Sequence, residues 1–222
     1  MQPAAATRIA LVTGASRGIG ADVAQQLAGP DTHVVVNYRE KAKRANTVVD
    51  AIRRAGGRAS TLGADISDEA AAAAMIERVG REFGRLDVLV LNASTGLDLG
   101  TDPGYAMRLN RDAQRQLATL ALPLMPAGGQ IVFVTSHQAH FFPNKAVPKG
   151  YGPIAASKRA GETALYAMRS EFDRRGIDFT VVSGEMMSDR ELATTIARAA
   201  SAPYPSGIVY VGGPDFLCKM SA

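Results

Sequence analysis

A glycine-rich turn near the start of the chain has the residue types and spacing needed to hold a phosphate group. The segment from Thr13 to Gly20 reads TGASRGIG and lies between an apolar run and an amphipathic stretch. Glycines permit a tight turn, and a helix that begins there directs unpaired N–H groups and the positive end of its dipole at an anion. Its place between a predicted strand and a predicted helix favours binding of a dinucleotide pyrophosphate over a purely structural turn.

The residues at the end of the second predicted strand indicate which dinucleotide is bound. In dinucleotide-binding folds of alternating strands and helices, an acidic residue at the end of the second strand holds a ribose 2′-hydroxyl. An arginine at that position accommodates a 2′-phosphate. The sequence here is Asn37-Tyr38-Arg39, with no acid before Glu40, and Arg17 lies in the glycine-rich turn. Guanidinium groups bind phosphate through charge-assisted hydrogen bonds. We therefore expect NADP(H), with NAD(H) less favoured; the alternative is that Arg39 is a solvated residue at a helix start.

The turn is similar to the TGxxxGxG motif of the short-chain dehydrogenase/reductase family, and the resemblance extends over essentially the whole chain. Leu91-Asn92-Ala93-Ser94 resembles the family's NNAG motif, departing from it at Leu91 and Ser94. Asp65-Ile66 resembles the adenine-edge position, although Asp65 is also suited to cap the next helix. The resemblance implies hydride transfer between nicotinamide and a small-molecule carbonyl or secondary alcohol.

The resemblance also implies a set of cofactor-binding residues. Ser183-Gly184-Glu185-Met186-Met187-Ser188 stands where the family has Pro-Gly-x-Ile-x-Thr, so the proline is absent while a hydroxyl remains at Ser188. The full set of expected cofactor-binding residues is Gly14, Ser16, Arg17, Gly18, Ile19, Gly20, Asn37, Tyr38, Arg39, Asp65, Ile66, Asn92, Ala93, Ser94, Lys158, Gly184 and Met186.

Four catalytic roles follow from the resemblance, and three of them have clear matches. In the family a tyrosine exchanges the proton on the substrate oxygen, a lysine lowers the tyrosine pKa, a serine hydrogen-bonds the substrate and an asparagine supports a proton-relay water. The resemblance assigns the last three roles to Lys158, Ser136 and Asn110. A phenol with an ordinary pKa of about 10 needs adjacent positive charge to exchange protons near neutral pH.

The tyrosine departs from the family's YxxxK spacing. The residue four before Lys158 is Ile154, which carries no exchangeable proton. The nearest tyrosine is Tyr151, and Pro153 suits the first turn of a helix, so we expect Tyr151 on the loop that enters the helix. Tyr151 is therefore a candidate acid, the alternatives being packing or substrate contact.

Two other interpretations remain open. His137 and His140 are further candidate proton donors, because the imidazole pKa lies nearest to neutrality. The sequence favours an NADP(H)-dependent oxidoreductase. The alternative is a catalytically impaired dinucleotide-binding protein that acts as a redox-state sensor or oligomer partner.

These residues require a scaffold of alternating strands and helices. Short Val- and Ile-rich runs alternate with Ala-rich amphipathic segments, the pattern of repeated strand–helix–strand units. The expected strands are 8–13, 32–37, 58–65, 86–92, 130–136, 177–183 and 207–211. The expected helices are 18–28, 41–55, 68–83, 104–125, 154–174 and 188–200. We expect one Rossmann-like, doubly wound α/β domain over residues 1–222, with about seven parallel strands and its ligand crevice at their carboxyl ends.

Local signals refine the expected helix boundaries. Gly56-Gly57 and Gly128-Gly129 are predicted to end helices, and Ser188 with Glu191 is predicted to form a capping box. The segment from His137 to Gly150 is expected to be a long loop.

Composition limits the classes of partner. The net charge is +4, but basic residues are spread along the chain and alternate with acids, so we expect no nucleic-acid partner. Cys218 is the single cysteine, which excludes an intrachain disulfide framework and a cysteine metal cluster. With no targeting segment and no apolar run near the ~20 residues of a membrane span, we expect a cytoplasmic protein. The helices at 104–125 and 154–174 resemble those through which family members pair, which predicts a homodimer or homotetramer.

Overall fold

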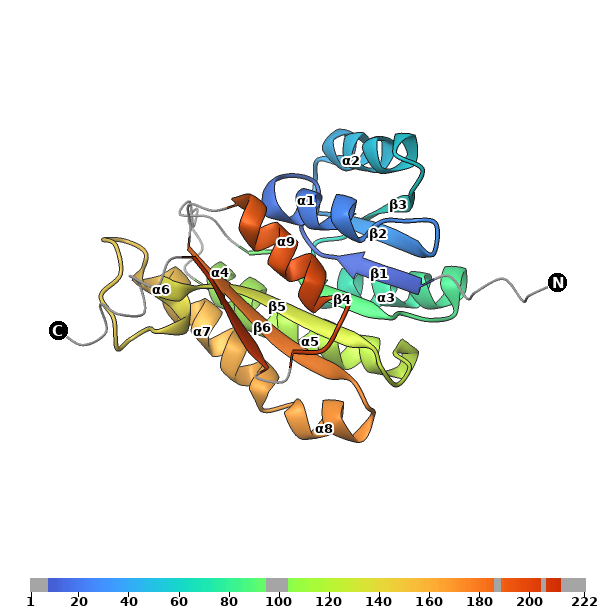
Figure 1. The fold of residues 1–222 in the computed structure, drawn as a ribbon. Coiled ribbons are helices and arrows are strands. Elements are labelled where there is room, and N and C mark those ends of the chain that lie inside the picture. Colours follow the sequence, from blue (N-terminus) through green and yellow to red (C-terminus); the bar gives the residue numbers. More distant parts are fainter. Residues whose placement is uncertain (1–7, 95–103, 186–188, 205–206, 213–222) are drawn as a thin grey trace.

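The computed structural model describes residues 8–94, 104–185, 189–204 and 207–212, and their strands form a single parallel sheet (Figure 1). The sheet has seven strands in the order β3-β2-β1-β4-β5-β6-β7. The strands are β1 (Arg8–Val12), β2 (Thr32–Tyr38), β3 (Arg58–Gly63), β4 (Val88–Leu91), β5 (Gln130–Ser136), β6 (Asp178–Gly184) and β7 (Ile208–Val211). The predicted doubly wound α/β fold is confirmed.

Helices cover both faces of this sheet. They are α1 (Gly18–Leu27), α2 (Ala42–Arg54), α3 (Glu69–Phe83), α4 (Tyr105–Met107), the π-helix η1 (Arg108–Asp112), α5 (Ala113–Ala121), the 3₁₀ helix η2 (Leu122–Leu124), α6 (His137–His140), α7 (Gly152–Tyr166), α8 (Arg169–Arg174) and α9 (Asp189–Ala199). One face packs against α1, α2 and α9, and the other against α3, α5 and α7. None of the described helices is long and apolar enough to cross a membrane.

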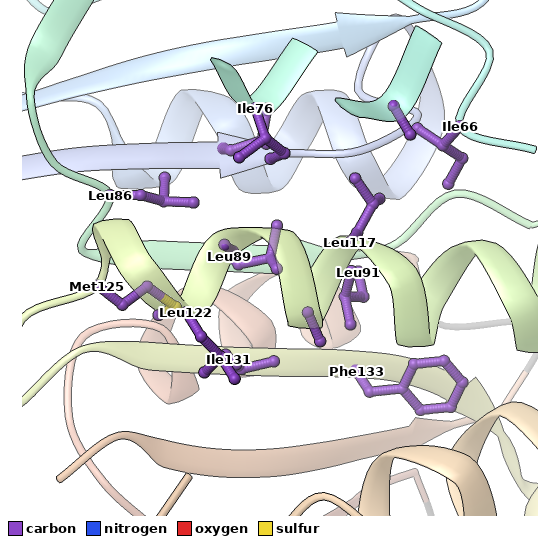
Figure 2. Close-up of a cluster of buried hydrophobic side chains, with 14 of the residues drawn as sticks. Ile66, Ile76, Leu86, Leu89, Leu91, Leu117, Leu122, Met125, Ile131 and Phe133 are labelled. Atoms are coloured by element: carbon purple, nitrogen blue, oxygen red, sulfur yellow. The ribbon is translucent and has the colours of Figure 1, made fainter. Parts of the chain in front are cut away.

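The strand sequences are apolar at consecutive positions because both faces of the sheet are buried. In β4, Leu89 and Leu91 belong to the core on the α3 and α5 side, whereas Val88 and Val90 belong to the core on the other side. Figure 2 shows Leu89 and Leu91 packed with Leu117 of α5. Successive side chains of a strand point to opposite faces, so a strand covered on both faces carries no polar alternation.

The strand order reverses between β1 and β4, and this reversal positions the site. From β1 the chain winds outward through β2 to β3, and from β4 it winds the other way to β7. The loops after β1 and β4 therefore diverge from neighbouring strand ends and leave a crevice between them, which is where open α/β sheets bind ligands.

Several predicted boundaries were wrong, while the others agree to within two residues. The expected helix 104–125 is interrupted by η1 and ends in η2, whose first turn contains Pro123. The expected helix 154–174 begins at Gly152 and divides into α7 and α8. The expected loop after β5 contains α6, which Ser136 caps through its hydroxyl.

Two predictions about caps also needed correction. Gly128 and Gly129 lie in the turn before β5 rather than at a helix end, because η2 has already ended at Leu124. Asp65 does not close β3, which ends at Gly63, and it does not cap α3; Asp68 accepts the hydrogen bond from Ala71 N that caps this helix. Ser188 of the predicted capping box lies outside the described residues.

Candidate functional site

A pocket of about 520 Å³ lies at the carboxyl ends of β1, β2 and β4. Its lining contains every expected cofactor-binding residue except Lys158, Gly184 and Met186. Lys158 lies on α7, Gly184 ends β6 directly beside Ser136 of β5, and Met186 lies outside the described residues. We call this pocket the glycine-turn end of the site.

The pocket also contains residues that sequence reasoning missed. They are Glu40, Lys41, Arg44, Ala64, Tyr105 and Leu109. Lys41 and Arg44 follow Arg39 closely, so the basic run at the start of α2 was a usable signal for further cations at the pocket. Tyr105 and Leu109 come from a different part of the chain, so no local pattern connects them to the glycine-rich turn.

Thr13 and Asn92 bind the glycine-rich turn to the end of β4. The Thr13 hydroxyl accepts hydrogen bonds from the backbone N–H groups of Asn92 and Ala93, both at 3.0 Å, and Asn92 Nδ2 donates to Thr13 O at 2.9 Å. A Cβ atom at Gly20 would lie 2.5 Å from Asn92 Nδ2 and 2.8 Å from Gly14 O. The close approach of α1 to the turn therefore requires glycine at position 20.

Asn37 supports the floor of the pocket rather than presenting a free amide to it. Its Oδ1 accepts from Gly14 N at 3.2 Å, and its Nδ2 donates to the carbonyl oxygens of Leu62 and Ala64, both at 3.2 Å. Asn37 is buried, and these bonds connect the glycine-rich turn to the end of β3. Its amide thus fixes the shape of the pocket wall.

The electrostatics of the glycine-turn end suit an anion. Arg17 is the N-cap residue of α1, and its side chain makes no capping hydrogen bond to the helix. In α3, by contrast, the Asp68 side chain accepts a hydrogen bond from the first turn. The N–H groups and dipole of α1 therefore remain available to an anion at the pocket. The charged lining residues are Arg17, Arg39, Lys41, Arg44, Glu40 and Asp65, which sum to +2 (four cations minus two anions).

At the other end of the site, Tyr151 lies against Ser136. The Tyr151 hydroxyl is 3.2 Å from Ser136 Oγ, and both residues are buried. Tyr151 immediately precedes α7, and Pro153 lies in the first turn of that helix, as the sequence predicts. The spacing of this tyrosine from Lys158 is unlike the family motif, but the fold brings its hydroxyl to the end of β5. We call this region the Tyr151 end.

Ile154 occupies a packed position beside that tyrosine. Its side chain is 1% exposed and clusters with Tyr151, Ala139 and Ala155. Phe142 and Val147 cover this cluster. Ile154 thus supports the aromatic ring of Tyr151 through apolar contact.

Lys158 lies in the second turn of α7, and Asn110 of η1 contacts the same turn. Burial lowers the pKa of Lys158 from its ordinary 10.5 to about 8. The Asn110 side chain is buried and donates from Nδ2 to Ser157 Oγ at 2.9 Å, and Ser157 Oγ donates to Ile154 O at 2.8 Å. These bonds hold η1 against the first turns of α7.

The π-helical turn at Asn110 fits against a glycine on α7. A Cβ atom at Gly161 would lie 1.9 Å from Asn110 O. No side chain can occupy that space without moving the backbone of one of the two helices. Gly161 therefore sets the distance between α7 and the helix that carries Asn110.

Both histidines proposed as alternative proton donors are already hydrogen-bonded within the protein. His137 is buried, with Nδ1 2.9 Å from Ser183 Oγ, and its Nε2–H donates to Val211 O at 3.0 Å. Burial lowers the His137 pKa, which favours the neutral ring. His140 Nδ1 lies 2.8 and 2.9 Å from the two Glu162 oxygens, and its Nε2 is 3.0 Å from Tyr210 Oη.

Glu162 is a buried acid at the back of the Tyr151 end. Its side chain is fully buried and accepts from Arg159 Nη1 at 2.9 Å as well as contacting His140. Because His140 lies one helical turn after Ser136, and Glu162 one turn after Lys158, this pair connects the elements that carry the serine and the lysine. Within the described part of the chain, no group of His, Cys, Asp and Glu is arranged to hold a metal ion.

Comparison with known proteins connects this geometry to a family. The model of the short chain dehydrogenase family matches residues 8–199. The chain is 33% identical to hydroxynaphthalene reductase of Aspergillus fumigatus over 79% of this chain and 65% of that protein. It is 34% identical to 1-cyclohexenylcarbonyl-CoA reductase of Streptomyces collinus over 86% of this chain and 69% of that protein. The matched region thus spans about two thirds of each relative.

A similar solved structure is a metagenomic short-chain oxidoreductase in complex with NADP. It is 27% identical, superposes with a TM-score of 0.80, and the match covers 94% of this chain and 98% of that one. The likeness therefore includes both the glycine-turn end and the Tyr151 end of the fold.

Proposed function

This chain belongs to the short-chain dehydrogenase family, and from that premise we propose that it is an NADP(H)-dependent oxidoreductase that reduces a carbonyl group with Tyr151 as the proton donor. The reverse reaction oxidises a secondary alcohol. The two relatives described above are reductases by name, which favours the reducing direction. The hydrogen bond between Tyr151 and Ser136 is the observation that carries the proposal.

The residues of the glycine-turn end fit a phosphorylated dinucleotide. Gly20 lets α1 start close against the glycine-rich turn, and α1 begins at the pocket without a side-chain cap that would occupy its N–H groups. Arg17, Arg39 and Arg44 supply cations for a 2′-phosphate, and an NADP complex of a similar structure supports the same choice of cofactor. When bound, NADPH supplies the hydride.

The residues of the Tyr151 end supply the proton. Ser136 Oγ hydrogen-bonds the carbonyl oxygen, and the Tyr151 hydroxyl donates its proton to that oxygen as the carbon accepts the hydride. The product is a secondary alcohol with its C–H from the hydride and its O–H from Tyr151. The resulting phenolate is stabilised by the Lys158 ammonium and regains a proton from solvent.

The first test is Tyr151→Phe in the full-length chain. We expect turnover with NADPH and a panel of aliphatic and bicyclic aromatic ketones to fall by about 10²–10⁴-fold. The NADPH dissociation constant should stay unchanged, because the hydroxyl lies outside the glycine-turn end. Turnover is followed by the loss of NADPH absorbance, and affinity by calorimetry.

Tyr166→Phe is the matched control, because it removes a phenol hydroxyl from α7 outside the catalytic group. It should turn over the same ketones at the wild-type rate. Full turnover by Tyr151→Phe would exclude Tyr151 as the proton donor and leave His137 and His140 as the candidates. Equal loss in both variants would indicate a general disturbance of α7.

We also propose that the chain is a single cytoplasmic domain that assembles as a homodimer or homotetramer through α5 and α7. The two helices pack against each other, and the outer positions of α7 include the small residues Ala160 and Ala164. Small residues allow helices of neighbouring subunits to approach closely. Light scattering at micromolar concentration should give the mass of a dimer or tetramer, and a monomer mass would refute the assembly.

A further inference from the structure

Arg39 and Tyr105 meet at the pocket although they are 66 residues apart in the sequence. Arg39 follows β2, Tyr105 begins α4, and both line the glycine-turn end. Arg39 Nη1 donates to the Tyr105 hydroxyl at 2.5 Å, and the centre of the Arg39 guanidinium is 5.8 Å from the centroid of the same ring. This hydrogen bond raises the Arg39 pKa. The pair thus joins two walls of the pocket.

A second described neighbour of the Arg39 guanidinium is the carboxylate of Glu40. Arg39 Nη2 lies 2.9 Å from Glu40 Oε1, with the two side chains 50% and 59% exposed. An exposed ion pair of this kind holds a long side chain weakly. The Tyr105 contact is also exposed, but it combines a hydrogen bond with an interaction between the guanidinium and the aromatic ring. Without Tyr105, the carboxylates of Glu40 and, at longer range, Asp65 would attract Arg39, and both compete with phosphate for the same N–H groups.

The contact with Tyr105 leaves Arg39 able to bind an anion. A guanidinium has five N–H donors, of which roughly three remain after the bonds to Tyr105 and Glu40. The Tyr105 ring also has the Arg108 guanidinium 5.9 Å from its centroid, so two cations lie near one aromatic ring. Such a ring restricts a cation without neutralising it, because the attraction comes from the ring quadrupole.

We propose that Tyr105 is a specificity-determining residue that holds Arg39 in place for the 2′-phosphate and thereby increases selection of NADPH over NADH. This inference rests on the proposed function, since it assumes that the glycine-turn end binds the phosphorylated dinucleotide. Tyr105 acts through Arg39, so its effect is confined to the ligand that carries the phosphate.

The test measures the dissociation constants of NADPH and NADH by calorimetry for the wild type, Tyr105→Phe, Arg39→Ala and the double variant. Tyr105→Phe keeps the ring and removes only the hydroxyl. It should weaken NADPH binding by about 3- to 10-fold, because NADPH must then immobilise the Arg39 side chain when it binds. NADH binding should change by less than about 2-fold. Tyr105→Phe should add nothing in the Arg39→Ala background, because the two residues act as one unit.

Tyr210→Phe is the matched control, since it also removes a phenol hydroxyl that contacts a nitrogen-bearing side chain, but away from this pocket. It should leave both dissociation constants unchanged. Equal weakening of NADPH and NADH by Tyr105→Phe, or no weakening of either, would overturn the role of Tyr105. If the wild type shows no preference for NADPH, the proposed cofactor is refuted. If the wild type prefers NADPH but Arg39→Ala keeps that preference, Arg39 does not select the phosphate and the role of Tyr105 is overturned.

Discussion

At the glycine-turn end of the site the charged groups of the wall are exposed and lie beside backbone groups, whereas at the Tyr151 end polar side chains are buried against one another. Arg39 and Glu40 each expose half or more of their side chains, while Glu162 is fully buried. The first region thus resembles a preformed surface for an anion. The second resembles a piece of protein core that contains acids, imidazoles and hydroxyls.

This difference predicts how each region responds to substitution. Exposed charges are solvated in the absence of ligand, so removing one alters affinity more than stability. A buried polar group depends on its partners, so removing one leaves another group unsatisfied. We therefore expect substitutions at the glycine-turn end to change cofactor binding, and substitutions behind Tyr151 to change the free energy of unfolding.

The largest effect on stability is expected for Gly161→Ala. The added Cβ would lie 1.9 Å from Asn110 O, so α7 and η1 must separate. We expect a loss of about 3 kcal/mol in the free energy of unfolding, which is the upper end of the usual cost of overpacking. The midpoint of thermal unfolding should fall by about 6–12 °C. Thermal denaturation followed by circular dichroism measures both.

Gly80→Ala is the control for helix propensity. A Cβ at Gly80 would meet the end of the Leu124 side chain at 3.2 Å, which can move slightly. The midpoint should stay within a few degrees of the wild type. If Gly161→Ala were as stable as Gly80→Ala, the contact between α7 and the Asn110 carbonyl would not be a fixed feature of the Tyr151 end.

The second expected effect compares two ion pairs directly. Glu162→Gln removes the charge of a buried carboxylate that contacts His140 and Arg159, and it should cost about 2–3 kcal/mol. Glu40→Gln removes the acid of the exposed Arg39 pair and should cost less than about 0.5 kcal/mol. Urea denaturation measures both values, and equal values would remove the contrast between the two regions.

The smallest of the three effects depends on pH and concerns Lys158. Its pKa is lowered from 10.5 to about 8 by burial, so the unfolded chain binds more protons at this side chain than the folded chain does. The resulting destabilisation is fully present below pH 8 and disappears as the pH rises toward 10.5. Lys158→Met, which keeps the length of the stem, should therefore stabilise the protein by about 1–2 kcal/mol at pH 7.

The stabilisation by Lys158→Met should shrink between pH 8 and pH 10. The NADPH affinity of the same variant measures separately whether Lys158 contacts the cofactor. Denaturation of the wild type and the variant at each pH gives the difference. A gain that does not change with pH would mean that the ammonium of Lys158 is solvated in the folded chain.

Much of the glycine-turn end was predictable because its signals are local. The segment 13–20 sits between a strand and a helix, and Arg39 follows the second strand, so chain order alone places both at one edge of a parallel sheet. Lys41 and Arg44 were missed because a basic run at a helix start is ambiguous without knowing which side faces the pocket. Tyr105 was missed because its contact with Arg39 exists only in the folded chain, where the end of β2 and the start of α4 line one pocket.

The Tyr151 end was only partly predictable, since its geometry depends on contacts between distant segments. The sequence identified Ser136, Tyr151 and Lys158 and the departure at Ile154, and Pro153 placed the start of the helix. Spacing along a helix did not reveal that the Tyr151 hydroxyl reaches Ser136, because Tyr151 precedes the helix and its direction is set by packing with Ile154 and Ala139.

By itself the sequence determined the order of strands and helices and the identity of the groups available for chemistry, because periodicity, glycines and prolines act over a few residues. Only the tertiary structure decided which of those groups meet. It engaged His137 and His140 in internal hydrogen bonds, buried Glu162 and placed Gly161 against Asn110. The physical reason is that side-chain partners and burial depend on the packing of helices and strands that are far apart in the chain.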